Sequence, residues 1–269
     1  MIEKRIFIPC DDHDIPMVIT YPHEEGNFPC VLLLHGFMAY KEGDGYLFTK
    51  TSQKFAEAGI ASARIDFCSM GENRFSRVHY GTEICIKEAK TAFRYFQEDN
   101  HIDCERIGVL GHSMGGRIAF LTSDLPSKCI ITFNGAVNVD KPSHLMMKGI
   151  SLQEIKEKGY TVFQTSDGRQ ELLYPKFIED MSIYSRDIYQ YKNPILVCVG
   201  ADDPTLDPQI SYDFVKNNCS NDITLLVIEK ANHTFNAKTG DYTKVYELLE
   251  KVIEWLKIHL KERQTIKCQ

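Results

Sequence analysis

Short apolar runs alternate along most of the chain with longer stretches in which apolar residues recur at helical spacing. A continuous apolar run predicts a strand buried on both faces, because such a strand has no side that meets water. Strands of this kind are predicted at 29–36, 60–66, 106–111, 128–135, 193–200 and 223–229. Two further strands are predicted at 2–9 and 15–21, on either side of a turn-rich DDHD segment.

Helices are predicted between these strands. Residues 47–59 form a helical pattern that ends at a glycine, and residues 82–98 gather their apolar side chains on one face. A further helix is predicted directly after Ser113, and residues 241–260 predict the last one. Alternating strands and helices favour an α/β fold with a mostly parallel sheet and helices on both faces.

One segment, residues 137–192, breaks this alternation. It is charged and rich in Met and Tyr, and it contains no clear buried strand. We therefore predict a cap that is inserted over one end of the sheet. The whole chain, residues 1–269, is predicted to be a single domain.

Composition and charge exclude several classes of partner. The net charge of −6 and the absence of a basic cluster argue against nucleic acid and against a membrane surface. The first residues carry charges and no apolar leader, and no apolar run is long enough to span a bilayer, so a cytoplasmic protein is expected. The nine cysteines are scattered and never spaced as C-x-x-C, so we expect reduced thiols and no metal site.

Candidate chemistry lies at the ends of three predicted strands. The stretch VLGHSMGGRIAF (109–120) places Ser113 between two glycines, at a strand-to-helix turn. The acidic stretch GADDPTLDP (200–208) contains Asp202 and Asp203, and EKANHTFNA (229–237) contains His233. The carboxyl ends of parallel strands meet at one edge of a sheet, so these side chains are expected to lie together.

A serine, an imidazole and a carboxylate form a competent nucleophilic system. A serine hydroxyl needs a neighbouring base, and an imidazole that is held by a carboxylate can accept its proton. Ser113 is therefore the candidate nucleophile, His233 the candidate base, and either Asp202 or Asp203 the acid. Asp207 is expected to cap the following helix.

These features resemble the serine α/β-hydrolase superfamily over essentially the whole chain. GHSMG resembles its nucleophile elbow, and HGF (35–37) resembles its oxyanion loop. The resemblance implies that the backbone N–H groups of Phe37 and Met114 form an oxyanion hole and that neither metal nor organic cofactor is needed. The usual Gly-x-x-Asp spacing of the superfamily selects Asp203 as the acid, with Asp202 as the fallback.

More narrowly, DFCSMGEN (66–73) and ANHTF (231–235) resemble the cinnamoyl and feruloyl esterase-like branch. Ser69 and Asn73 depart from the usual Gly and Ser of that branch, so the loop near the acyl group is expected to differ. Polar cap residues hold the aromatic acyl group in such esterases. By position alone, the candidates here are Asp140, Tyr160 and Tyr174.

The expected function is hydrolysis of small to medium acyl esters, those of cinnamoyl or feruloyl type included, through an acyl-enzyme. The expected partner is a small-molecule ester, and the oligomeric state stays open. Two alternatives remain: a serine peptidase or amidase of the acyl-peptidase-like type, and a ligand-binding protein without catalysis.

Overall fold

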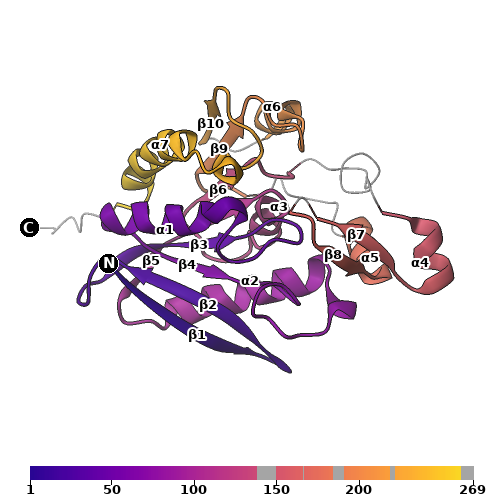
Figure 1. Cartoon of the computed structure of the whole chain (residues 1–269). Helices are drawn as coiled ribbons and strands as arrows, with labels where there is room; N and C mark the ends of the chain where they lie inside the picture. Colours follow the sequence, from indigo (N-terminus) through magenta and orange to yellow (C-terminus); the bar gives the residue numbers. More distant parts are fainter. Residues whose placement is uncertain (138–149, 166, 184–190, 219–221, 262–269) are drawn as a thin grey trace, which may run out of the picture.

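An eight-stranded, mostly parallel sheet forms the centre of the protein in a computed structural model (Figure 1). The structure describes residues 1–137, 150–165, 167–183, 191–218 and 222–261. The sheet strands are Ile2–Cys10 (β1), His13–Tyr21 (β2), Phe28–Leu34 (β3), Ala61–Ile65 (β4), Ile102–His112 (β5), Ile130–Phe133 (β6), Ile195–Gly200 (β9) and Ile223–Ile228 (β10).

The strand order is β1-β2-β4-β3-β5-β6-β9-β10. The pairs β1–β2 and β2–β4 are antiparallel, whereas every pair from β4–β3 to β9–β10 is parallel. The α/β fold class predicted from the sequence is confirmed, and each predicted strand has its counterpart in the sheet.

Helices cover both faces of the sheet (Figure 1). The α-helices are Leu47–Glu57 (α1), Thr82–Gln97 (α2), Met114–Leu121 (α3), Leu152–Lys158 (α4), Pro175–Ile183 (α5), Pro208–Asn217 (α6) and Thr243–His259 (α7). Helices α1 and α7 pack on one face, and α2, α3 and α6 contribute to the apolar cluster on the other. Short 3₁₀ helices lie at Asp44–Tyr46 (η1), Arg77–His79 (η2) and Ala237–Thr239 (η3).

Strand β3 shows why the central strands are apolar at every position. Val31 and Leu33 pack in the cluster with α1 and α7, whereas Cys30, Leu32 and Leu34 pack in the cluster on the opposite face. Successive side chains of a strand point to opposite faces, and helices cover both faces here. An unbroken apolar run is the pattern that this environment requires.

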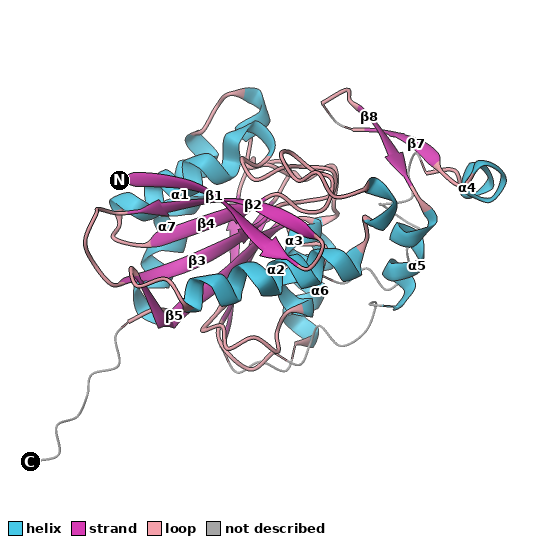
Figure 2. Ribbon diagram, turned by 90° about the horizontal axis from the view of Figure 1, so that it is seen from below, coloured by secondary structure: helices cyan, strands magenta, loops and turns pink. Residues whose placement is uncertain are grey.

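The segment predicted as a cap contains a small antiparallel hairpin. Its strands are Thr161–Gln164 (β7) and Gln170–Leu173 (β8), which form a separate two-stranded sheet. Figure 2 shows this hairpin, with α4 and α5, to one side of the central sheet. The sequence did not predict the hairpin, because each strand has only four residues and only Thr161 and Leu173 are buried in them.

Most of the described cysteines lie in the core. The described cysteines are free thiols, and all of them except Cys104 are buried. Burial raises the pKa of the Cys129 thiol to about 12.

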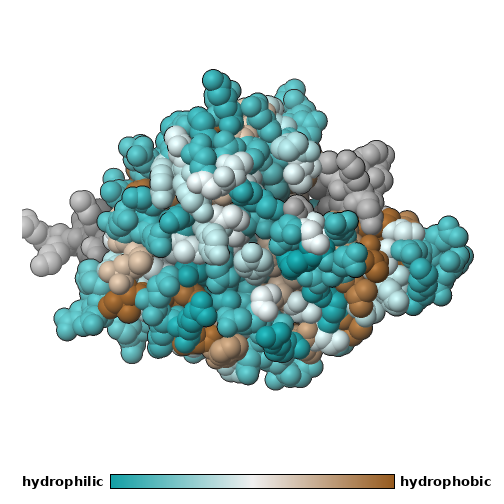
Figure 3. Space-filling view, in the orientation of Figure 1, coloured by the Kyte–Doolittle hydropathy of each residue, from teal (hydrophilic) through white to brown (hydrophobic). Residues whose placement is uncertain are grey.

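Figure 3 shows a mainly hydrophilic face with small apolar patches. In the part of the chain that the structure describes, every helix is too short or too polar to cross a membrane.

Candidate active site

The sheet topology brings three candidate side chains to one edge. Ser113 follows β5, Asp203 follows β9 and His233 follows β10. Strand β6 lies between β5 and β9, and β10 is the next neighbour of β9. All four strands are parallel, so their carboxyl ends open on the same side. Ser113 and His233 accordingly line one pocket of about 290 Å³.

Ser113 occupies a strained turn between β5 and α3. Its backbone has φ 54° and ψ −121°, a region that residues with a side chain rarely adopt. The two flanking glycines make the turn possible. A Cβ atom at Gly111 would lie 2.1 Å from the carbonyl oxygen of Gly115, and one at Gly115 would lie 1.9 Å from that of Leu34. Only glycine fits at these two positions, so the turn can hold Ser113 at the strand end.

A buried carboxylate orients the imidazole of His233. Nδ1 of His233 lies 2.7 Å from Oδ2 of Asp203, whose side chain is 1% exposed. The other carboxylate oxygen of Asp203 accepts hydrogen bonds from the backbone N–H groups of Thr205 and Leu206, at 2.8 and 3.0 Å. Both oxygens are therefore used, and the carboxylate is fixed in the orientation that faces the imidazole.

The two neighbouring acids have other places. Asp202 is exposed, and its side chain has no described contact with His233. Asp207 caps α6, because its carboxylate accepts the backbone N–H of Gln209 at 2.9 Å. The choice of Asp203 from the Gly-x-x-Asp spacing agrees with this geometry, as does the expected capping role of Asp207.

Two residues that the sequence analysis did not assign hold the backbone of His233. The carbonyl of His233 accepts hydrogen bonds from Nε2 of His112 at 2.9 Å and from Nδ2 of Asn134 at 3.0 Å. The Asn134 carboxamide oxygen also accepts the N–H of Gly200 at 2.8 Å, which ties the end of β6 to the end of β9. Burial, with the neighbouring His233, lowers the pKa of His112 to about 4.

The loop 35–39 carries the N–H group of Phe37 into the same region. Buried His35 accepts the Phe67 N–H at Nε2, 3.0 Å away, and donates from Nδ1 to the Gly36 carbonyl at 2.8 Å. The Gly36 carbonyl also accepts the N–H of Ala39 at 3.3 Å. In a trans peptide, the C=O and the following N–H point in opposite directions. Because the Gly36 carbonyl is fixed in this way, the Phe37 N–H of the same peptide group points away from His35 and from the N–H of Ala39.

Met114, the residue after Ser113, opens helix α3. The first N–H groups of a helix have no partner within it and point out along the axis. The N–H of Met114 is therefore available next to the Ser113 side chain. Phe37, in the loop after β3, and Met114, at the start of α3, are thus the two candidate backbone donors near Ser113.

The β7–β8 hairpin forms one wall of the pocket. Phe163, Thr165, Asp167 and Arg169 line it, and the ring of Phe163 packs edge-on against that of Phe37 with centroids 5.1 Å apart. Within the described residues, no group of three or more His, Cys, Asp or Glu side chains is placed to hold a metal ion.

Of the substrate-binding residues that the sequence analysis expected in the cap, those that the structure describes are not found in the lining of this pocket. Tyr160 and Tyr174 are not among the pocket-lining residues, and instead face one another with ring centroids 6.2 Å apart. Asp140 lies outside the described residues. The pocket-lining Phe163 and Arg169 gave no signal in the sequence, because the hairpin that presents them was not predicted.

The departures at Ser69 and Asn73 have structural roles. Ser69 adopts a left-handed conformation, φ 59°, and its hydroxyl accepts a hydrogen bond from Nε of Arg77 at 3.1 Å. Asn73 is buried and donates to the Glu88 carboxylate at 2.8 Å and to the Asp66 carbonyl at 3.1 Å. These side chains shape the loop that follows β4.

Comparison with known proteins gives one relative that matches part of the chain and one that matches most of it. A 31.7 kDa Escherichia coli protein from the traX-finO intergenic region is 28% identical over 127 residues, which are 45% of this chain and 43% of that protein. The chain thus matches less than half the length of that relative. YitV of Bacillus subtilis (strain 168), named as a candidate esterase, is 22% identical over 252 residues, which cover 86% of this chain and 89% of YitV.

A similar solved structure and a family model complete the comparison. Est1E from Butyrivibrio proteoclasticus, solved with ferulic acid bound, has a TM-score of 0.77 at 17% identity, covering 96% of this chain and 100% of Est1E. That likeness establishes the α/β-hydrolase fold. The model of the prolyl oligopeptidase family matches residues 52–263. The chain therefore belongs to the prolyl oligopeptidase family and has the α/β-hydrolase fold.

Proposed function

We propose that the protein is a serine carboxylesterase in which Ser113, His233 and Asp203 form the catalytic triad. One observation carries the proposal: His233, hydrogen-bonded to the buried Asp203, lines the same pocket as Ser113, which a strained turn presents. Strained backbone persists where the surrounding structure holds it, and such positions cluster at active sites.

In the proposed reaction, Oγ of Ser113 attacks the ester carbonyl while Nε2 of His233 accepts the hydroxyl proton. Asp203 holds the tautomer with the proton on Nδ1 and stabilises the imidazolium. The N–H groups of Phe37 and Met114 stabilise the negative oxygen of the tetrahedral intermediate. His233 then gives its proton to the leaving alcohol, and water repeats the sequence on the acyl-enzyme.

The pocket supports small to medium acyl groups as substrates. Its volume of about 290 Å³ is at the lower end of the range for small-molecule sites. Phe37 and Phe163 give it an aromatic wall, which suits acyl groups of cinnamoyl or feruloyl type. Est1E, solved with ferulic acid bound, supports the same acyl class, and YitV, named as a candidate esterase, supports ester hydrolysis.

A peptidase or amidase is the second candidate, because the matching family model is that of the prolyl oligopeptidase family. The same triad can cleave an amide, whose leaving amine requires the proton from His233. Turnover of an ester and of the amide with the same acyl group separates the two functions. The proposed esterase is expected to cleave the ester far faster, and equal or faster amide cleavage would favour the peptidase.

The nucleophile is tested by a fluorophosphonate probe, which reacts with an activated serine. We expect a single label, mapped to Ser113 by peptide mass spectrometry. The variant Ser113→Ala should keep the circular dichroism of the unmodified protein and lose labelling and ester turnover together. Ser123→Ala, in the turn after α3, is the matched control and should keep both. A label elsewhere, or near-normal turnover in Ser113→Ala, would reject the proposal.

A further inference from the structure

Met38, which directly follows Phe37, is held by three contacts in an unfavourable conformation. Its φ of 54° lies in the left-handed region, which an unbranched residue with a long side chain rarely adopts. Its N–H donates to the hydroxyl of Tyr80 at 3.4 Å, and its carbonyl accepts from Nη2 of Arg169 at 2.7 Å. Its sulfur lies 3.0 Å from Nη1 of Arg77. These contacts hold a conformation that the backbone alone disfavours.

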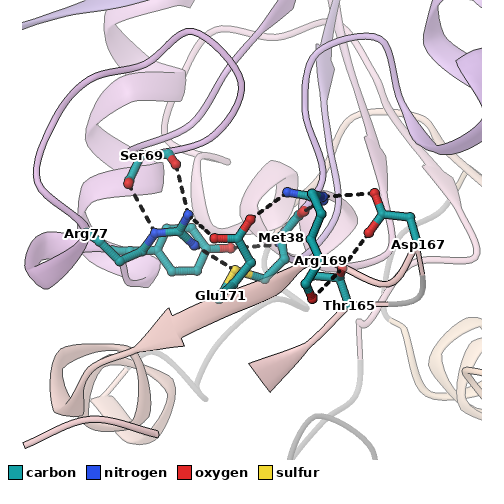
Figure 4. A network of polar contacts seen from close by, with 8 residues as sticks. Met38, Ser69, Arg77, Thr165, Asp167, Arg169 and Glu171 are labelled. Carbon is teal, nitrogen blue, oxygen red and sulfur yellow. Dashed lines mark hydrogen bonds and ion pairs between the residues drawn. The ribbon is translucent and has the colours of Figure 1, made fainter. Parts of the chain in front are cut away.

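Arg169 is itself fixed within the β7–β8 hairpin, as Figure 4 shows. Its Nε donates to Asp167 at 2.9 Å and its Nη1 to Glu171 at 2.7 Å. Glu171 also accepts from Nη2 of Arg77 at 2.6 Å, so that one carboxylate joins both arginines. The arginines thus connect the hairpin to the loop 35–39 and to η2, although Arg169 and Met38 are 131 positions apart in the sequence.

These contacts fix two linked peptide groups of the loop 35–39. His35 and Ala39 hold the carbonyl of Gly36, which lies in the peptide group that carries the Phe37 N–H. Arg169 holds the carbonyl of Met38, and the same peptide group carries the Ala39 N–H that donates to the Gly36 carbonyl. A peptide group is planar, so holding the Met38 carbonyl also directs the Ala39 N–H and, through it, the peptide group of the Phe37 N–H. The contact from His35 comes from the loop itself, whereas the contact from Arg169 comes from the hairpin.

We propose that Arg169 is a positioning residue, which aims the N–H of Phe37 at the developing oxyanion by holding the carbonyl of Met38. This inference rests on the proposed function, in which that N–H belongs to the oxyanion hole. It assigns to the hairpin a part in the chemical step, in addition to its place in the pocket wall. An oxyanion donor acts through its direction, so a small rotation of the loop reduces its effect.

A direct contact between Arg169 and substrate is the competing role, since Arg169 also lines the pocket. The geometry favours positioning. Each of its three nitrogens already donates to a protein oxygen, from Asp167, Glu171 and Met38 respectively. A substrate anion would compete with two carboxylates for the same guanidinium, which raises the cost of that contact.

The experiment compares Arg169→Met, Arg169→Lys and the control Arg106→Met, whose guanidinium pairs with Asp103 away from the pocket. We expect kcat for a small ester to fall about 10- to 100-fold in Arg169→Met, with KM changed less than about twofold, because only transition-state binding is lost. A trifluoromethyl ketone, which forms an oxyanion on the serine, should bind more weakly by a similar factor. The matching methyl ketone should bind almost unchanged.

Arg169→Lys should recover part of kcat, since an ammonium group can donate to the Met38 carbonyl but cannot join the carboxylates in the same way. Should Arg169→Met fail to fold, Glu171→Gln tests the same link with a smaller change, and we expect a several-fold loss of kcat at constant KM. A rise in KM at constant kcat, or unchanged kcat in all of these variants, would overturn the proposal. An unmodified protein without turnover or labelling would instead reject the proposed function, and the positioning role with it.

Discussion

Nε2 of His112 donates a hydrogen bond of 2.9 Å to the backbone carbonyl of His233, and the rings of the two residues lie 4.8 Å apart. The histidine of the elbow therefore anchors the loop that carries the proposed base. A protonated ring at this position would be buried and would face a second imidazole. Burial, with the neighbouring His233, lowers the pKa of His112 from the ordinary 6.5 to about 4.

This relationship predicts a loss of stability in weak acid. Between pH 6.5 and pH 4 the unfolded chain binds a proton at His112 that the folded protein does not, so the free energy of unfolding falls as the pH falls. His112→Gln keeps an N–H donor near the same place and does not titrate. Urea unfolding at several pH values should show a weaker acid dependence in this variant.

The exposed His23 provides the control for this measurement. His23→Gln should retain the acid dependence of the unmodified protein, because it leaves His112 and the hydrogen bond from His112 to His233 unchanged. Equal pH profiles for His112→Gln and the unmodified protein would contradict the assignment to His112.

The two adjacent acids after β9 should differ sharply in their effect on catalysis. Asp203→Asn removes the charge that orients His233 and should lower kcat by about 10³- to 10⁴-fold, because the amide favours the wrong tautomer. Asp202→Asn is the matched control, since its side chain is exposed one position away, and kcat should change less than about twofold. Steady-state kinetics with an ester substrate measure kcat for both variants. A severe defect in Asp202→Asn with normal Asp203→Asn would reverse the assignment.

Phe163 should determine acyl preference. The variant Phe163→Ala removes an aromatic wall of the pocket, so kcat/KM for an aromatic ester should fall about tenfold relative to an acetyl ester. Val162→Ala, on the exposed neighbour in the same strand, is the control and should leave the ratio unchanged. Tyr160→Phe and Tyr174→Phe should also leave it unchanged. A uniform loss over all esters would argue against selection by Phe163.

Gly115→Ala should prevent the elbow from forming as it stands. The added Cβ would lie 1.9 Å from the carbonyl oxygen of Leu34, a backbone atom that cannot move aside without disturbing β3. We expect a loss of several kcal/mol, seen as a large fall in Tm. Gly168→Ala is the control: its φ is +86° and its added Cβ meets no atom within 4 Å, so the cost should be about 1 kcal/mol. Similar Tm values for both variants would contradict this account.

The sequence alone determined the central sheet and the proposed triad. Strands such as β3 and β9 are buried on both faces, and that burial leaves a continuous apolar run in the sequence. Ser113, Asp203 and His233 each follow such a run, and parallel strands place their carboxyl ends at one edge. The strands and the grouping of these side chains depend on local pattern and on a general rule of topology. The choice of Asp203 over Asp202 depended instead on the Gly-x-x-Asp spacing that the resemblance to the serine α/β-hydrolase superfamily implies.

Only the tertiary structure decided which cap residues reach the pocket and what holds the loop 35–39. The β7 and β8 strands are short and only partly buried, so no periodic pattern distinguishes Phe163 from Tyr160. The hydrogen bonds from Arg169 to Met38, and from His112 to His233, join residues more than a hundred positions apart. Each depends on the direction of a single donor toward a backbone carbonyl, which any residue type can supply. Such a pairing leaves no mark in the sequence, because the acceptor is part of every peptide bond.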